Sequence, residues 1–225
     1  MSSGEPPKPN PLPEISLTSF ILGIVVGLSL ALFFLDFKVF YLYITLIATF
    51  HFLEYYITSK YQPSKVSVDS FLINNGLEYQ LAHALALTES LIEIYFFPSF
   101  KRSLLPIKLI GFFAALGGQS LRTLAMITSG ENFSHTIEGT KTDAHVLVTD
   151  GIYSFSRHPS YAGFFYWALG TQLMLLNPLS FIIFLLLLYR FFGRRIRYEE
   201  STLITFFGDR YVKYRETVPV RIPFL

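Results

Sequence analysis

The segment richest in residues that could do chemistry is 151–163, with the sequence GIYSFSRHPSYAG. Arg157 and His158 directly precede Pro159, a residue favoured at the first position of a helix. The N–H groups at a helix start have no intrahelical partner, so this segment could hold an anionic group. Gly163 lacks a Cβ and would let a ligand or another backbone approach closely. The alternative is that the Arg-His pair and the nearby aromatic residues only anchor the chain at a membrane interface.

A second charged group follows at 194–200, with the sequence RRIRYEE. Arg195 and Glu199 are four residues apart and would share one helix face. A guanidinium binds a carboxylate or phosphate well, and Glu199 would then face a cation. The alternative is an ordinary surface ion pair, which contributes little to stability.

Several ionisable residues lie inside apolar segments, where they are costly and often functional. His51 and Glu54 share one such segment, Glu89 and Glu93 another, and Arg122 lies in a third. We expect them mainly to join helices, with Arg122 paired to one of the carboxylates.

Motifs for nucleotide, metal and nucleophile chemistry are missing from the sequence. There is no G-x-G-x-x-G, no P-loop, no H-E-x-x-H and no G-x-S-x-G. The chain has no Cys and its five His do not cluster, so no metal site is predicted. A net charge of +2 without a basic arm gives no indication of a nucleic-acid partner.

The elements that must position these residues are apolar helices. Of the 225 residues, 52% are hydrophobic and only 15% are charged, against about 25% charged in a soluble domain. A helix needs about 20 apolar residues to cross a bilayer. Six segments approach that length: 15–35, 39–58, 81–97, 104–127, 161–176 and 178–192. We predict an all-α integral membrane protein with about six transmembrane helices and no Rossmann domain.

Three regions follow from this pattern: a proline-rich disordered tail at 1–14, four transmembrane helices in 15–127, and a region at 128–225 that holds both charged groups and would be the catalytic, cofactor-binding region if they act on a ligand. This third region would contain a tight helical hairpin at 161–192, followed by cytosolic C-terminal helices. Asn177 and Pro178 favour the start of the second hairpin helix. Gly208 favours a helix end, and Asp209 could cap the next helix.

The distribution of Lys and Arg predicts the orientation. With six spans and a cytosolic N-terminus, the cytosolic segments hold most of the Lys and Arg, as the positive-inside rule requires. Both termini are therefore predicted in the cytosol. The glycosylation sequence at Asn132 would lie on the cytosolic side and remain unused.

These motifs together resemble a known family. G-x-Y-x-x-x-R-H-P-S-Y-x-G at 151–163 is followed by further matching positions: Tyr166-Trp167, Gly170-Thr171-Gln172, Arg190, Arg195, Glu199-Glu200, Phe207-Gly208, Tyr211, Tyr214 and Val218-Pro219. Upstream, Leu121-Arg122 and the runs at 132–135 and 142–148 also match. The pattern strongly resembles the isoprenylcysteine carboxyl methyltransferase family over about residues 118–224. The first three spans match only in hydropathy and length.

The resemblance implies a fold and a reaction. Family members lack the soluble methyltransferase fold and bind S-adenosylmethionine in a cytosol-facing pocket of the C-terminal half. They esterify the α-carboxylate of a C-terminal farnesyl- or geranylgeranyl-cysteine in processed CaaX proteins, with the prenyl chain reaching the pocket from the bilayer. The implied location is the endoplasmic reticulum membrane, and the implied partners are prenylated CaaX-protein C-termini and the lipid bilayer.

The resemblance also implies roles for individual residues. The cofactor positions are Glu138, His145, Val146, Leu147, Val148, Tyr153, His158, Pro159, Ser160, Tyr161 and Glu199. Arg195 would bind the substrate carboxylate and act in catalysis together with Glu199. Glu138 departs from the family's Gln, and a carboxylate can accept hydrogen bonds but cannot donate them as an amide does.

Three other functions fit parts of the pattern. A membrane phospholipid N-methyltransferase would use the same cofactor on an amine. Sterol reductases, which use NADPH, carry a similar Arg-His-Pro-x-Tyr-x-Gly but have about ten spans. A non-catalytic scaffold could use the arginines to bind anionic lipid headgroups.

Overall fold

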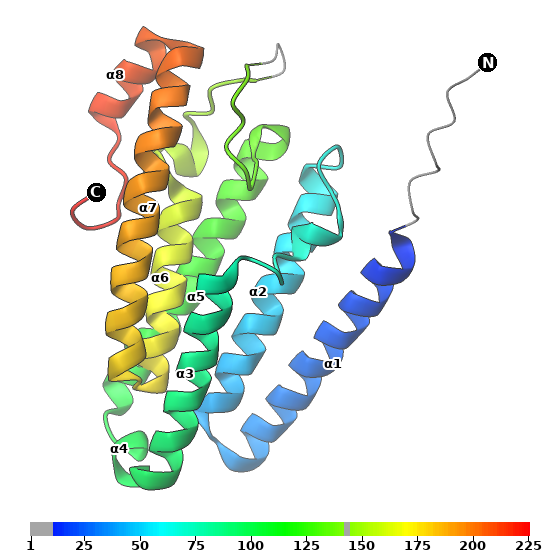
Figure 1. Cartoon of the computed structure of the whole chain (residues 1–225), viewed down its shortest axis with the longest axis vertical. Coiled ribbons are helices and arrows are strands. Elements are labelled where there is room, and N and C mark those ends of the chain that lie inside the picture. Colours follow the sequence, from blue (N-terminus) through cyan, green and yellow to red (C-terminus); the bar gives the residue numbers. More distant parts are fainter. Residues whose placement is uncertain (1–10, 142–144) are drawn as a thin grey trace.

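The computed structural model describes residues 11–141 and 145–225, and it contains helices and no strand within that part of the chain. Six long helices form an elongated bundle: α1 (Leu12–Asp36), α2 (Val39–Tyr61), α3 (Leu77–Phe96), α5 (Leu105–Ser129), α6 (Pro159–Leu175) and α7 (Pro178–Phe207) (Figure 1). The shorter elements are α4 (Pro98–Arg102), α8 (Asp209–Thr217) and the 3₁₀ turns η1 (Val68–Phe71), η2 (Gly130–Asn132) and η3 (Gly151–Ser154). The predicted all-α class is confirmed.

Within the part of the chain that the structure describes, three stretches are long and apolar enough to cross a membrane: α1, α2 and the continuous stretch Leu105–Asn132. The membrane character is thereby confirmed, and the number of six spans stays a prediction. α1 begins at Leu12, so the last residues of the predicted disordered tail are helical, and residues 1–10 lie outside the described part. Pro13 is tolerated there because the first turn of a helix needs no N–H partner.

α7 is a single helix of 30 residues. The predicted span 178–192 and the charged group 194–200 are therefore continuous, and the helix ends at Gly208 as predicted. Asp209 is the first residue of α8, but its side chain makes no cap hydrogen bond, so the capping prediction is wrong.

Glycines bring α5 and α6 into backbone contact. A Cβ on Gly163 would lie 2.6 Å from the backbone N of Arg122, and one on Gly170 would lie 2.5 Å from the backbone N of Ala115. On α5, a Cβ on Gly118 would lie 2.5 Å from the carbonyl oxygen of Gly163. The close approach predicted for Gly163 is therefore made by another backbone, and it brings Arg122 beside the start of α6.

Gly118→Ala is expected to destabilise the bundle because the added methyl group has no space between the two backbones. Overpacking of this kind costs about 1–3 kcal/mol. Gly117→Ala is the matched control, since nothing lies within 4 Å of a Cβ at Gly117. Thermal unfolding in detergent should show a lower midpoint for Gly118→Ala alone. Equal midpoints for the two variants would contradict the close packing.

The turn between α6 and α7 is held by charged residues from α3 and α4. The Glu89 carboxylate accepts the backbone N–H groups of Leu179 (2.8 Å) and Ser180 (2.7 Å) at the start of α7. Lys101 donates to the carbonyls of Leu175 and Leu176 at the end of α6. Each charge complements the helix end that it contacts.

Asn177 occupies the N-cap position of α7, as predicted, but its side chain does not cap the helix. It accepts a hydrogen bond from Lys101 and donates to the carbonyl of Ala86, while Glu89 serves the helix start. Lys101 also forms an ion pair with Glu93 at 2.5 Å. The prediction that Glu89 and Glu93 join helices is confirmed.

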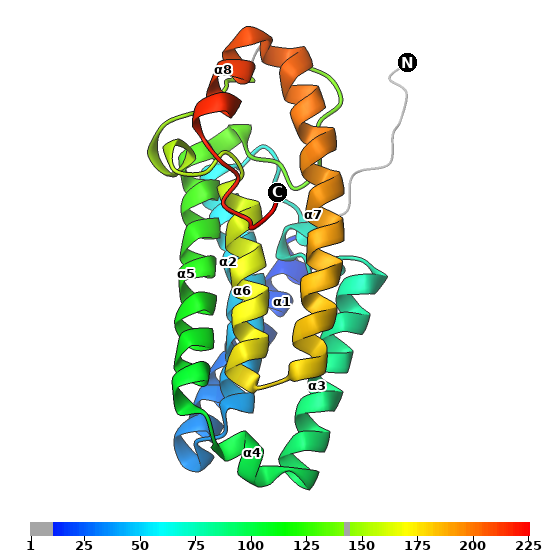
Figure 2. The ribbon, with the colours of Figure 1, turned by 90° about the vertical axis from the view of Figure 1, so that its left-hand side faces the viewer.

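The two ends of the bundle differ. One end carries α8, the C-terminal segment and the long connection between α5 and α6, whereas the other carries α4 and the α1–α2 turn (Figure 2). Arg157 binds the C-terminal segment to the first of these ends. Its backbone N–H donates to the Pro219 carbonyl (3.1 Å), and its guanidinium donates to the Val218 carbonyl (2.9 Å).

Candidate active site

Two adjoining pockets lie at the end of the bundle that carries α8, and together they form what we call the site pocket. Their shared lining residues are Asn132, Ser134, Val146, Glu199, Leu203 and Phe207. The α5–α6 connection, the start of α6 and the end of α7 all contribute, and Tyr211 and Tyr214 of α8 close one side.

The residues predicted to hold the cofactor all line the site pocket: Glu138, His145, Val146, Leu147, Val148, Tyr153, His158, Pro159, Ser160, Tyr161 and Glu199. They come from three separate stretches of the chain. Their convergence is consistent with a common ligand, and their individual roles stay predictions.

Glu199 and Arg195 are connected through the hydroxyl of Tyr161. That hydroxyl donates to the Glu199 carboxylate at 2.5 Å and accepts a hydrogen bond from Nε of Arg195 at 2.7 Å. The two residues share a helix face as predicted, but they form no ion pair with each other in the described structure. Tyr161 therefore holds one carboxylate and one guanidinium apart while fixing both.

Arg195 lies beside the site pocket rather than in its lining. Its second anchor is the backbone carbonyl of His135, which accepts a hydrogen bond from Nη2 at 2.6 Å. Its guanidinium also lies over the rings of Tyr161 and Phe191, at 5.3 and 5.9 Å from their centroids. These contacts leave the cation oriented but not neutralised by a carboxylate.

The Arg-His pair before Pro159 binds a carboxylate of the chain itself. Nε of Arg157 donates to Glu200 at 2.5 Å, and Nε2 of His158 lies 3.1 Å from the same oxygen. Burial raises the pKa of Glu200, but the hydrogen bonds and charges of His158 and Arg157 outweigh it and hold that pKa at about 2. The His158 ring also stacks on Tyr161 with an interplanar angle of 3°.

Glu138, which lines the site pocket, links the connection between α5 and α6 to the connection that follows α2. One of its carboxylate oxygens accepts from Lys65 at 2.8 Å and the other from His145 at 2.6 Å. The hydrogen bond from Lys65 holds the pKa of Glu138 below its ordinary value, against the effect of burial. The position where the family has Gln therefore accepts hydrogen bonds here, as a carboxylate must.

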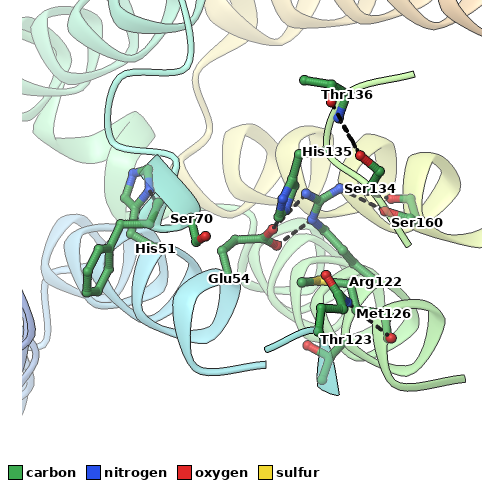
Figure 3. A network of polar contacts seen from close by, with 12 residues as sticks. His51, Glu54, Ser70, Arg122, Thr123, Met126, Ser134, His135, Thr136 and Ser160 are labelled. Atoms are coloured by element: carbon green, nitrogen blue, oxygen red, sulfur yellow. Dashed lines mark hydrogen bonds and ion pairs between the residues drawn. The ribbon is translucent and has the colours of Figure 1, made fainter. Parts of the chain in front are cut away.

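A buried ion pair lies directly beneath the site pocket, where the side chains of Glu54, Arg122, His135 and Ser160 converge (Figure 3). Arg122 donates to both oxygens of Glu54, at 2.5 and 2.8 Å. It also donates to the hydroxyl of Ser160 at 2.9 Å, and His135 contacts Glu54 at 2.9 Å. The prediction that Arg122 pairs with a carboxylate of another helix is confirmed.

This ion pair supports the site from two directions. Through Arg122 it holds Ser160, which lines the site pocket. Through His135 it positions the segment whose carbonyl binds Arg195. Glu54 is 1% exposed and Arg122 is 7% exposed, so both charges depend on each other for compensation.

Comparison with known proteins agrees with this arrangement. Residues 109–205 match the model of the isoprenylcysteine carboxyl methyltransferase (ICMT) family. The chain is 51% identical over 222 residues to a protein-S-isoprenylcysteine O-methyltransferase from Saccharomyces cerevisiae, covering 96% of this chain and 93% of that protein. This chain belongs to the isoprenylcysteine carboxyl methyltransferase family.

Other members of this methyltransferase family support the assignment. The chain is 39% identical over 214 residues to the protein-S-isoprenylcysteine O-methyltransferase of Homo sapiens, covering 94% of this chain and 75% of that protein. A solved structure of a eukaryotic intramembrane Ras methyltransferase, ICMT, matches with a TM-score of 0.90 at 39% identity, covering 93% of this chain and 76% of that one. The resemblance predicted from the sequence is confirmed.

Four residues around this methyltransferase's site were not among the predicted site residues: Glu54, Lys65, His135 and Glu200. Glu54 was identified as a costly intramembrane charge, and Glu200 was noted only as part of the family pattern. Lys65 is an isolated residue in a connection, and His135 was noted only as the last residue of the matching run 132–135. Only the folded chain brings Lys65, His135 and Glu200 within hydrogen-bond distance of the predicted site residues Glu138, Arg195 and His158. Glu54 reaches the site indirectly, through its contacts with Arg122 and His135.

Proposed function

We propose that the chain transfers the methyl group of S-adenosylmethionine to the α-carboxylate of a C-terminal prenylated cysteine in processed CaaX proteins. Family membership supports the enzyme class and the methyl ester product, and it favours them over the phospholipid methyltransferase, reductase and scaffold alternatives. The observation that carries the site assignment is the Tyr161 hydroxyl, which fixes Arg195 and Glu199 beside one pocket.

The chemistry of the site pocket fits this cofactor. When bound, S-adenosylmethionine supplies a methyl group on a positively charged sulfonium. Glu199 belongs to both halves of the site pocket and offers the carboxylate that such a cation needs. Phe206, Phe207 and Tyr153 offer aromatic surface to a planar base, and the 146–148 backbone runs along the same wall.

The residues of the chain can promote this reaction without a general base. An α-carboxyl group has a pKa of about 3.3–3.7 and is already ionised at cytosolic pH. Arg195 binds and orients the acceptor carboxylate, and its anchors on Tyr161 and His135 keep it from swinging away. Because the reaction consumes one positive and one negative charge, exclusion of water and correct positioning supply most of the rate.

Glu199→Gln is expected to weaken S-adenosylmethionine binding roughly tenfold or more, because it removes a charge that faces a cation while keeping the side-chain shape. The matched control is Glu216→Gln, which makes the same charge change on the exposed surface of α8. Calorimetry on the two purified variants measures the affinity. An unchanged dissociation constant for Glu199→Gln would contradict its role at the cofactor.

The proposed location is the endoplasmic reticulum membrane, with six spans formed by α1, α2, α3, α5, α6 and α7. Both termini and the site pocket would face the cytosol. The proposed regions are the membrane helices of 15–127 and a catalytic region at 128–225 that holds the α6–α7 hairpin and α8. The excess of Lys and Arg near the site pocket supports this orientation.

Asn132 is expected to remain unglycosylated when the chain is synthesised in microsomes. Its side chain lines the site pocket and accepts a hydrogen bond from the backbone N–H of Val146 at 2.8 Å. A band shift reversed by glycosidase would place this end of the bundle in the lumen and overturn the orientation.

Methyl transfer from labelled S-adenosylmethionine tests the function directly. The acceptor is N-acetyl-S-farnesylcysteine, and the controls are unprenylated N-acetylcysteine and phosphatidylethanolamine. We expect base-labile label on the farnesylated acceptor alone. Label on the lipid amine would favour the phospholipid enzyme instead, and absence of both transfer and cofactor binding would contradict the proposal.

A further inference from the structure

A second large cavity lies at the opposite end of the bundle from the site pocket. Its volume is about 510 Å³, which falls in the range of about 300–1,000 Å³ typical of ligand sites. The α1–α2 turn, α4 and the adjoining parts of α3, α5 and α6 enclose it. Both views of the ribbon place α4 and the α1–α2 turn at this end (Figures 1 and 2).

The lining of this cavity is basic. Lys38, Lys101, Arg102 and Lys108 all line it. They are the only Lys and Arg residues in the connections 36–40, 97–108 and 175–178 that form this end of the described structure. Under the proposed orientation this end faces the lumen, where the positive-inside rule disfavours Lys and Arg. The four cations of this end are therefore gathered around one cavity.

Only part of this charge is compensated within the chain. Lys101 forms an ion pair with Glu93 and donates to three oxygens of the α6–α7 turn. Its charge is therefore used to stabilise the fold rather than to bind a ligand. Lys38 pairs with Asp36 at 2.6 Å, but both are about half exposed, and such a pair contributes little and rearranges readily.

Two cations of the cavity have no carboxylate partner among residues 11–141 and 145–225. Lys108 donates only to the backbone carbonyl of Lys101, and no described acid lies within 4.0 Å of the Arg102 guanidinium. With Asp36, Glu93 and the nearby Glu89 against four bases, this end of the bundle keeps an excess of one positive charge. A guanidinium with free donors is well suited to a phosphate group.

The surface beside the cavity has the composition of a membrane interface. Phe37, Tyr95, Phe96 and Phe97 are between 60% and 78% exposed and lie at this end of the bundle. Aromatic residues gather at the headgroup level of a bilayer. A lipid whose headgroup enters the cavity would therefore have apolar surface beside it for its acyl chains.

We infer that this cavity binds the phosphate of an anionic phospholipid, with Arg102 and Lys38 as the principal contacts and Lys108 completing a positive wall. The inference does not depend on the methyl-transfer reaction, because the cavity lies at the other end of the bundle. A bound lipid would tie the α1–α2 turn to α4 and so connect the two halves of the bundle at that end.

The test uses the full chain in detergent, titrated with phosphatidylglycerol and, separately, with phosphatidylcholine of the same acyl chains, and followed by native mass spectrometry. Lys38→Gln/Arg102→Gln is the test variant. Arg210→Gln/Lys213→Gln is the matched control, since it makes the same charge change on exposed residues of α8. The methyl-transfer rate and the unfolding midpoint in phosphatidylcholine report that each variant is folded.

We expect the test variant to bind phosphatidylglycerol roughly 25-fold more weakly, about fivefold for each cation, with phosphatidylcholine binding unchanged. The control variant should bind both lipids as the parent does. Equal losses in the two variants would mean non-specific attraction to net charge and would overturn the inference, as would no loss in either. Displacement of phosphatidylglycerol by soluble glycerol phosphate at equal concentration would assign the site to a free phosphate compound and would also overturn it.

Discussion

Arg195→Ala is expected to lower kcat/KM for the farnesylated acceptor roughly 100-fold or more, while the dissociation constant of S-adenosylmethionine changes by less than about threefold. Among the described residues, the Arg195 guanidinium is the one cation bonded to the Tyr161 hydroxyl, and its two anchors fix its direction. Alanine removes the group that orients the acceptor carboxylate and leaves Glu199 in place. Methyl-transfer kinetics and calorimetry on the same preparation separate the two quantities.

Two companion variants sharpen this prediction. Arg195→Lys keeps the charge but cannot reach Tyr161 and His135 with one planar fork, so it should recover only a small part of the activity. Arg197→Ala, an exposed neighbour on the same helix, should behave like the parent. Loss of cofactor binding in Arg195→Ala, with turnover of bound substrate preserved, would show that the residue serves the cofactor instead.

Glu54→Gln is expected to lower the free energy of unfolding by about 3–5 kcal/mol, the largest effect on stability that the structure predicts. Arg122 would keep its charge at 7% exposure and lose the one carboxylate that pairs with it in the described structure. His135 would lose the same partner, so the carbonyl that anchors Arg195 would be held less firmly. The KM of the prenylated acceptor should therefore rise along with the loss of stability.

Reversible unfolding in mixed micelles measures this effect, and the double variant Glu54→Gln/Arg122→Met provides the control. Removing both charges takes away the uncompensated cation, so stability should return to within about 1 kcal/mol of the parent. The acceptor KM should remain raised in the double variant, because His135 and Ser160 still lack their partners. A single variant as stable as the parent would contradict the dependence of Arg122 on Glu54.

The extent to which the fold could be predicted varied with the kind of signal. Long uncharged runs such as 15–35 have one favourable solution in a bilayer, so their helices were evident from composition. The ends of helices were less evident. α7 continues through its charged group because that part of the helix reaches beyond the predicted span, where arginine and glutamate cost little. At the start of α7, the backbone N–H of Leu179 donates a hydrogen bond to Glu89, which lies 90 residues away in the sequence.

For the candidate site as well, local sequence patterns were predictive and the contacts between side chains were not. The run at 151–163 and the pair Arg195 and Glu199 carry a local pattern, and the pattern was enough to indicate both the family and the residues that line the site pocket. It could not show that Tyr161 separates Arg195 from Glu199, because periodicity places two residues on one face but does not say which side chain lies between them.

The sequence by itself determined that the chain is helical, that it enters a membrane, and which family it belongs to, because hydropathy and short motifs are local properties. Tertiary structure alone decided the partners of Glu54, Lys65, His135 and Glu200, since each contact joins residues more than 40 positions apart. It also gathered Lys38, Arg102 and Lys108 around one cavity. Such contacts depend on how helices pack, and glycines such as Gly118 and Gly163 set that packing through backbone distances that a sequence does not display.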